Sequence, residues 1–202
     1  MISSPLKTVG RLILASASPR RKSLLQELGL DFEIKAARIE ESPAAGESPQ
    51  EFVKRAASDK AGYISRANPG YWVLGADTIV VHNNRILGKP GDAAEAFEVL
   101  LTLSGREHLV HTGFCLMHEK ERVTVSSVVT TEVSFFLFSR DIAAAYVATG
   151  EPLDKAGAYG IQGCGGFLVE KINGSYSNVV GLPLVEVVEG LLRNKVVEPG
   201  KG

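Results

Sequence analysis

The sequence predicts an α/β protein with a mixed sheet, on two observations. Short apolar runs such as residues 11–15 alternate with helical patterns along most of the chain, which favours parallel strands. Residues 107–138 are instead rich in Val, Thr and Phe, with one short charged break at 119–121. That stretch predicts two long antiparallel strands, so we expect a partly antiparallel central sheet.

The helices are predicted from their end signals. Ser18 offers an N-cap, Pro19 a first helical position, and Gly29 ends the first helix. A second helix is opened by Ser48, Pro49 and Glu51, with Phe52, Ala56 and Tyr63 or Ile64 on its inner face. A third helix begins at the capping pair of Asp92 and Glu95.

The other elements are expected in this order along the chain: strand 32–36, loop 38–46, strands 71–75 and 78–82 around a Gly-Ala-Asp interruption, a hairpin turn at Asn83 and Asn84, helix 139–149, glycine-rich loop 157–166, strand 167–172, polar loop 173–178 and helix 184–194. We expect a single two-lobed domain over residues 11–195, with terminal extensions at 1–10 and 196–202.

The composition is that of a folded protein with no strong overall charge. Of 202 residues, 45% are hydrophobic and 22% charged, and the net charge is −1. This balance argues against a stable nucleic-acid or membrane partner, so an anionic ligand would have to be held by a local basic cluster. Cys115 and Cys164 are far apart and no signal-peptide or membrane-spanning run is present, so we expect free thiols in the cytoplasm.

The first candidate site covers residues 16–22, which read Ser-Ala-Ser-Pro-Arg-Arg-Lys. Here a strand leads into a helix whose first turn offers free amides, the Ser16 hydroxyl, and the guanidinium groups of Arg20 and Arg21. Helix N-termini attract anions, and arginine binds phosphate with two hydrogen bonds. The alternative is a capped surface helix with solvated basic residues, although cations in a first turn oppose the helix dipole.

The second candidate site is acidic. Asp77 lies within an apolar strand-like stretch, where an unpaired charge would be costly to bury. Its partner could be a cation or a metal ion, unless Asp77 lies in a turn at Gly75. The acidic pair at residues 40–41 is by itself an ordinary solvated loop, but beside Asp77 it could help to bind Mg²⁺ or Mn²⁺. Lys60 and Lys89 read as surface lysines unless they face a phosphate chain.

The third candidate region is rich in glycine. Residues 157–166 contain five glycines, which permit close approach of the backbone to a ligand. Gln162 could read a base edge through its amide, and Ser175, Ser177 and Asn178 offer further hydrogen bonds. The alternative is a pair of tight loops joining strands. The chain lacks a P-loop motif, and His108 and His111 lack the spacing that would indicate zinc.

Together, these segments resemble the Maf family of nucleotide pyrophosphatases over residues 12–191. The motifs that carry the resemblance are LASASPRR (14–21), GADTIV (75–80), LGKP (87–90), LSGREH (103–108), DKAGAYGIQG (154–163) and GSYSNVVGLPL (174–184). The resemblance implies a two-lobed Maf/ITPase-like fold with a cleft between the lobes, commonly a homodimer. It also implies hydrolysis of a nucleoside triphosphate to a monophosphate and pyrophosphate, with a divalent cation, Mg²⁺ or Mn²⁺.

The resemblance assigns roles residue by residue. Asp77 matches the family's catalytic aspartate, described as a proton acceptor, and Glu41 and Lys60 match the acidic and basic residues that join it. The positions tied to substrate choice correspond to Arg20, Thr78 and Gln162, a pattern similar to the branch that acts on dTTP and UTP. Members of the family are also linked to the clearing of modified pyrimidine nucleotides before these reach nucleic acid.

We expect Ser16, Arg20, Arg21 and Lys89 to hold the triphosphate, while Glu41 and Asp77 bind the metal ion. A sequence cannot separate the role of Asp77 as a general base from that of a metal ligand. Two alternatives stay open at this stage, a purine-directed triphosphatase and a non-catalytic nucleotide- or RNA-binding module.

Overall fold

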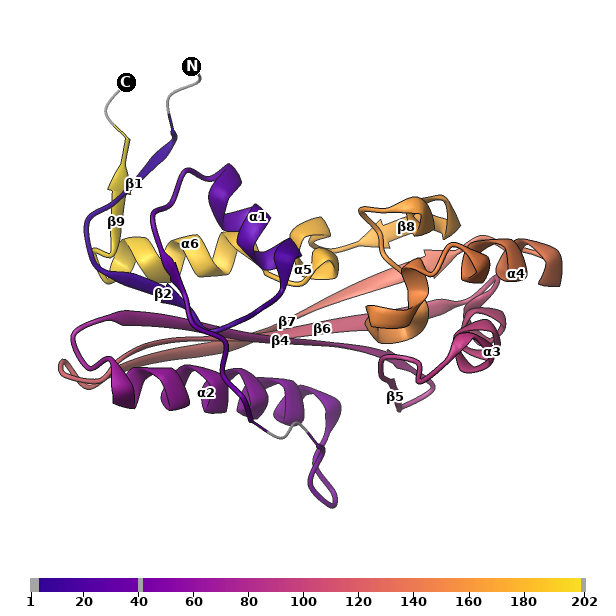
Figure 1. Cartoon of the computed structure of the whole chain (residues 1–202), viewed down its shortest axis with the longest axis horizontal. Helices are drawn as coiled ribbons and strands as arrows, with labels where there is room; N and C mark the ends of the chain where they lie inside the picture. Colours follow the sequence, from indigo (N-terminus) through magenta and orange to yellow (C-terminus); the bar gives the residue numbers. More distant parts are fainter. Residues whose placement is uncertain (1–3, 40–41, 201–202) are drawn as a thin grey trace. The chain divides into compact units, whose positions relative to one another are not determined.

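The computed structural model describes residues 4–39 and 42–200 (Figure 1). The chain divides into two compact units. Unit 1 comprises the described residues of segments 1–77, 112–128 and 181–202, and unit 2 comprises residues 78–111 and 129–180. No helix in the described ranges is long and apolar enough to cross a bilayer.

The elements alternate between strands and helices as expected. The strands are β1 (Leu6–Thr8), β2 (Leu12–Leu14), β3 (Glu33–Ile34), β4 (Trp72–His82), β5 (Arg85–Leu87), β6 (Glu107–His118), β7 (Val123–Phe135), β8 (Val169–Asn173) and β9 (Val197–Pro199). The helices are α1 (Pro19–Glu27), α2 (Pro49–Ala67), α3 (Ala93–Leu103), α4 (Arg140–Ala148), α5 (Tyr176–Val180) and α6 (Leu184–Arg193), with short 3₁₀ helices η1 (Glu151–Asp154), η2 (Ala156–Ala158) and η3 (Cys164–Leu168).

The main sheet is mixed, which confirms the fold class. Its strand order is β3-β2-β4-β6-β7-β8, and β5 pairs with β4 off this path. Strand β2 runs parallel to both β3 and β4, whereas the β4–β5 and β7–β8 pairs are antiparallel. The hairpin at Asn83 and Asn84 is also confirmed, since both residues have the positive φ angles (49° and 59°) that a tight turn between β4 and β5 requires.

In unit 1, helix α2 covers one face of the sheet, and α1 and α6 cover the other (Figure 1). The α2 face has a core in which Ile13 and Ala15 of β2 and Val73 of β4 pack with Ala57 and Ala61 of the helix. Side chains two residues apart on a strand share a face. Residues 75 and 77 of β4 therefore lie on this same α2 face.

The start of α2 follows its sequence signals. The Ser48 side chain accepts a hydrogen bond from the Glu51 amide, and the Glu51 carboxylate accepts one from the Ser48 amide. This reciprocal capping box fixes the first turn, and Pro49 occupies its first position. Of the two expected inner residues at the far end, Ile64 is buried and Tyr63 is 48% exposed.

Two glycines let α2 lie unusually close to the sheet. A Cβ atom added to Gly75 of β4 would lie 2.8 Å from the Ala61 amide nitrogen and against the Ala57 carbonyl oxygen. At Gly113 of β6 it would lie 2.9 Å from the Lys54 nitrogen. Only glycine fits at such distances, so these two positions set the separation between the helix and the strands.

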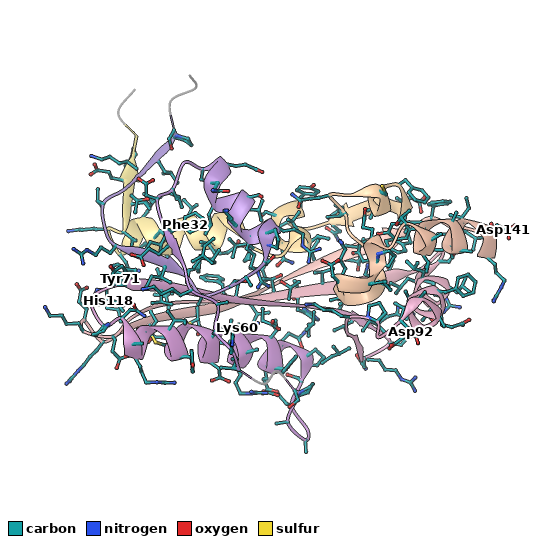
Figure 2. All side chains as sticks on the ribbon, viewed as in Figure 1. Phe32, Lys60, Tyr71, Asp92, His118 and Asp141 are labelled. Atoms are coloured by element: carbon teal, nitrogen blue, oxygen red, sulfur yellow. The ribbon has the colours of Figure 1, made fainter. Side chains whose placement is uncertain are left out.

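Unit 2 is built around a second apolar core. Leu100 and Leu103 of α3 pack with Phe135 of β7, Tyr159 and Leu168, all of them buried. Helix α3 begins where Asp92 accepts a hydrogen bond from the Glu95 amide, as expected (Figure 2 labels Asp92). The Glu95 carboxylate accepts from the Gly91 amide instead of the Asp92 amide, so the cap is one residue wider than a standard capping box.

Two local predictions were wrong. Strand β4 runs unbroken through the Gly-Ala-Asp segment, because Gly75 makes room for α2 and Asp77 has a partner on that helix. The polar segment 173–178 is not a plain loop, because helix α5 begins within it. There Ser175 Oγ accepts a hydrogen bond from the Asn178 amide, which favours a helical turn.

The terminal segments pair with each other. Strands β1 and β9 form a separate antiparallel sheet in which Leu6 lies opposite Pro199. The Gly200 amide donates to the Pro5 carbonyl oxygen at 3.0 Å, and Ser4 Oγ donates to the Leu28 carbonyl oxygen at the end of α1. This pairing, which the sequence did not indicate, connects the ends of the chain to α1.

Candidate functional site

A buried ion pair in unit 1 joins α2 to β4. Lys60 Nζ donates to Asp77 Oδ1 at 2.7 Å, and both side chains are 10% exposed. Lys60 extends from the side of α2 that faces the sheet (Figure 2). Burying either charge without a partner would cost free energy, so the presence of one accounts for the burial of the other.

The residues near the carboxyl end of β2 form a second polar cluster. Arg21, in the first turn of α1, donates from Nη1 to Ser16 Oγ at 3.0 Å and from Nε to the Gly181 carbonyl oxygen at 2.8 Å. The Ser16 hydroxyl also accepts from the Ser18 amide. Ser16 and Arg21 are both buried, so the structure gives Arg21 a role in fixing the loop between β2 and α1.

The helix start itself has the features of an anion site. Ser18 Oγ accepts from the Arg21 amide as the N-cap, and no acidic residue lies in the first turn of α1. Arg20 lies in that turn and is partly exposed, in contrast to buried Arg21. Arg20 is therefore the arginine of this pair that is more accessible to a ligand.

The two polar clusters lie at matching positions of neighbouring strands, just past the end of β2 and in the middle of β4. Strands β2 and β4 are parallel, Leu14 lies opposite Leu74, and the Ala15 amide donates to the Leu74 carbonyl oxygen at 2.8 Å. Continuing this register places Ser16 opposite Ala76, next to Asp77. Ligands of parallel α/β sheets bind beyond the carboxyl ends of the strands, which is where this register brings the loop before α1.

The other candidate residues lie in unit 2. Thr78 follows Asp77 directly in β4 and is partly buried. Lys89 is exposed just after β5, where the neighbouring Gly88 carbonyl oxygen accepts from the Gly157 amide at 3.1 Å. Gln162 is exposed in a turn that the Gly163 amide closes onto the Gly160 carbonyl oxygen.

Some residues that the sequence offered as ligand contacts have protein partners. Asn178 is fully buried and donates from Nδ2 to the Val110 carbonyl oxygen and to Thr131 Oγ1. Ser175 interacts with Ser177 Oγ and with Thr131 through its backbone. The segment that contains them is therefore fastened to β6 and β7, and its hydroxyls and amide serve the fold.

Sequence reasoning missed Tyr146 of α4 and Glu151 of η1, which hold the turn around Gln162. Glu151 follows Gly150, a left-handed residue (φ 75°) that comes directly after the helix expected over 139–149. An acid placed directly after a helix stop and shortly before three glycines was the available signal.

The Asp77 carboxylate suits a divalent cation that arrives with a substrate. Lys60 contacts Oδ1, and the described residues place no other hydrogen-bond donor on this carboxylate, so Oδ2 can take a ligand. The described ranges hold no group of three or more His, Cys, Asp or Glu residues arranged for a metal ion. One or two carboxylates together with substrate phosphates form a donor set that Mg²⁺ accepts. Glu41, the other expected ligand, lies outside the described residues.

A loop contact precedes α2. Arg55 of α2 donates from Nε to Glu47 Oε1 at 2.7 Å and from Nη2 to the Ser42 carbonyl oxygen at 3.0 Å. The Glu47 carboxylate also accepts from the Ala44 amide. These bonds bind residues 42–47 to the helix that carries Lys60, and they lower the pKa of Glu47 to about 2, chiefly through the Arg55 hydrogen bond.

Known proteins similar to this chain cover most of its length. A protein of *Desulfotalea psychrophila* named dTTP/UTP pyrophosphatase is 52% identical over 92% of this chain and 95% of its own length. Proteins of the same name from *Myxococcus xanthus* (51% identical; 90% of this chain, 91% of the relative) and *Syntrophus aciditrophicus* (50%; 90% and 88%) are comparably similar.

A solved structure supports the fold independently. The Ham1 protein of *Staphylococcus aureus* superposes with a TM-score of 0.53 over 92% of this chain and 99% of that one, at 12% identity. At this identity the likeness concerns the fold alone. The family model described as Maf-like protein matches residues 11–194, and with relatives about 50% identical over nine-tenths of the chain this places the protein in the Maf family.

Proposed function

We propose that this protein is a nucleotide pyrophosphatase that hydrolyses dTTP and UTP, and modified pyrimidine nucleotides, between the α- and β-phosphates. The observation that carries the proposal is the buried Lys60–Asp77 pair, whose Nζ and Oδ1 atoms are 2.7 Å apart. Its strand β4 is the parallel neighbour of β2, which leads into a helix N-terminus suited to phosphate. The names of relatives about 50% identical over nine-tenths of the chain support the same substrates. Such an enzyme removes unwanted nucleotides before they are incorporated into nucleic acid.

The reaction needs a water molecule, an acceptor for its proton and a stabilised leaving group. The water oxygen forms a bond to the α-phosphorus, and the bond from that phosphorus to the bridging oxygen breaks. Pyrophosphate leaves with the electron pair, and the proton of the water passes to the Asp77 carboxylate. Lys60, which fixes the orientation of that carboxylate through Oδ1, also counters the negative charge that develops.

The basic residues hold the triphosphate in this proposal. Arg20 offers a partly exposed guanidinium at the start of α1, and Lys89 an exposed ammonium group. Ser16 and Arg21 shape the loop before α1, and the Arg21 guanidinium adds positive charge for the phosphates at this helix start. Thr78 and Gln162 recognise the pyrimidine, together with Arg20.

When bound, a divalent cation, Mg²⁺ or Mn²⁺, would neutralise part of the negative charge of the phosphates. Glu41 and Asp77 are the residues that would hold it. From the family resemblance we further infer a homodimer. From the unpaired cysteines and the near-zero net charge we infer a cytoplasmic protein without a stable nucleic-acid partner. Light scattering on the purified protein tests the dimer.

A nucleotide panel tests the function directly. The protein is incubated with dTTP, UTP, CTP, ATP or GTP and with Mg²⁺ or Mn²⁺, and pyrophosphate and orthophosphate are quantified separately. We expect metal-dependent pyrophosphate release that is fastest with dTTP and UTP. Orthophosphate as the first product would contradict cleavage at the α–β bond. Preference for ATP or GTP would indicate a purine-directed enzyme, and tight binding without turnover a regulatory binding module.

A further inference from the structure

The turn that carries Gln162 is held by its flanks. Its backbone closes through the Gly163 amide and the Gly160 carbonyl oxygen, at 3.3 Å. That bond is long, and the Gln162 side chain is exposed, so the turn's own contacts fix it weakly. Its position therefore depends on what holds residues 160 and 163–165.

A two-residue cluster provides those contacts. Glu151 Oε2 accepts from the Cys164 amide at 2.8 Å, and Oε1 accepts from the Gly165 amide at 3.1 Å. On the other flank, Tyr146 Oη accepts from the Gly160 amide at 3.1 Å. The same hydroxyl donates to Glu151 Oε1 at 2.9 Å, so both flanks converge on one carboxylate.

The glycines of this segment make room for that cluster. A Cβ atom at Gly163 would lie 2.6 Å from Glu151 Cδ, and one at Gly165 would lie 2.7 Å from Tyr146 Cζ. Neither distance is possible for a real side chain in this arrangement. The glycine-rich sequence is thus explained by close approach of the protein's own Glu151 and Tyr146, where the sequence suggested approach to a ligand.

The cluster is firmly anchored to unit 2. Tyr146 lies on α4, is 2% exposed and packs in the core of this unit. Burial disfavours the ionised form of Glu151, but the Gly165 and Cys164 amides and the Tyr146 hydroxyl outweigh it, so the Glu151 pKa is lowered. The carboxylate therefore receives its three hydrogen bonds in the charged form, which is the stronger acceptor.

We infer that Glu151, with Tyr146, is a positioning residue that holds the Gln162 turn and so sets the selectivity for pyrimidine nucleotides. This inference rests on the proposed function, in which Gln162 contacts the base. A base-reading amide must be held within a fraction of an ångström to discriminate between bases. Glu151 achieves this without touching the substrate.

The test compares Glu151→Gln, Tyr146→Phe and Gln162→Ala with the wild type. A glutamine has one oxygen acceptor and cannot accept from both Cys164 and Gly165 in the same geometry. We expect amide exchange at residues 164 and 165 of Glu151→Gln to accelerate at least about tenfold. The ratio of kcat/KM for UTP to that for GTP should fall at least about tenfold in all three variants.

A double variant separates positioning from general damage. If Glu151 acts through Gln162, the UTP-to-GTP ratio of Glu151→Gln/Gln162→Ala equals that of Gln162→Ala alone. The control is Glu98→Gln, the same substitution at an exposed position of α3 in unit 2. It should change neither the amide exchange at residues 164 and 165 nor the ratio of kcat/KM for UTP to that for GTP.

Three results would overturn the inference: unchanged amide exchange in Glu151→Gln, a wild-type ratio in that variant beside a lowered ratio in Gln162→Ala, or additive losses in the double variant. Failure of the proposed function would look different. The wild type would then release no pyrophosphate from any nucleotide, while the exchange measurement would still decide whether Glu151 holds the turn.

Discussion

Lys60 and Asp77 lie 17 positions apart in the sequence, yet Nζ and Oδ1 are 2.7 Å apart, with nine-tenths of each side chain buried. The contact joins the middle of a long helix to the middle of a buried strand. It is possible because Gly75, two residues before Asp77 on the same face of β4, lets α2 approach. The pair is thus both a structural link and the centre of the proposed chemistry.

Replacing the aspartate should separate catalysis from folding. Asp77→Asn keeps the size of the side chain but removes the proton acceptor, so we expect pyrophosphate release from dTTP to fall by a factor of about 10²–10⁴. Circular dichroism and the melting temperature check that the fold survives. Near-normal turnover in a folded variant would show that Asp77 is not the catalytic group.

Removing the lysine should damage stability more than removing the pair. Lys60→Met leaves the Asp77 carboxylate buried without its partner, which costs about 3–5 kcal/mol in the free energy of unfolding. Urea denaturation measures this loss. The double variant Lys60→Met/Asp77→Asn carries no unpaired charge, and we expect it to unfold at a higher urea concentration than Lys60→Met. The opposite order would mean that the lysine stabilises by packing alone.

The spacing of α2 from the sheet can be tested with one methyl group. Gly75→Ala places a Cβ 2.8 Å from the Ala61 nitrogen, so the helix must shift, at a cost of about 1–3 kcal/mol. Because Lys60 moves with α2, turnover should fall together with stability. Gly70→Ala is the matched control, since a Cβ there meets nothing within 4 Å. Equal effects of the two substitutions would contradict the close-approach argument.

The loop before α2 should respond to acid. The Glu47 pKa is lowered from 4.5 to about 2, mainly by Arg55, so its contribution to stability is complete above pH 4.5 and is lost as the pH falls to 2. The melting temperature of the wild type should therefore exceed that of Glu47→Gln at pH 5–7, and the two should converge near pH 2. A difference that does not change over this range would exclude the Arg55 contact as its source.

Much of the fold could be predicted because its signals are local. The Ser48–Glu51 capping box and the Asn83–Asn84 turn each depend on residues within four positions of one another. The long strands β6 and β7 were equally visible, since their Val- and Thr-rich composition extends over more than twenty residues. The residues that cause each of these features are close together in the sequence.

The rest depends on contacts between distant residues. The supposed break near Asp77 disappears only because α2 supplies Lys60, and Arg21 is fixed by the carbonyl oxygen of Gly181, 160 positions away. The candidate site was predictable as a set of residue types, but the burial of Arg21 was not. The role of Glu151 needed the structure, because two of its three partners are backbone amides, which leave no pattern of side chains.

The pairing of β1 with β9 brings the first and last strands of the chain next to each other. Because the Gly200 amide donates to the Pro5 carbonyl oxygen, a few glycines between the two ends would join them without disturbing either strand. The exposed turn at Gly46 could then be opened to provide new termini. A circularly permuted protein of this kind would keep every strand pairing while reversing the order in which α1 and α2 leave the ribosome.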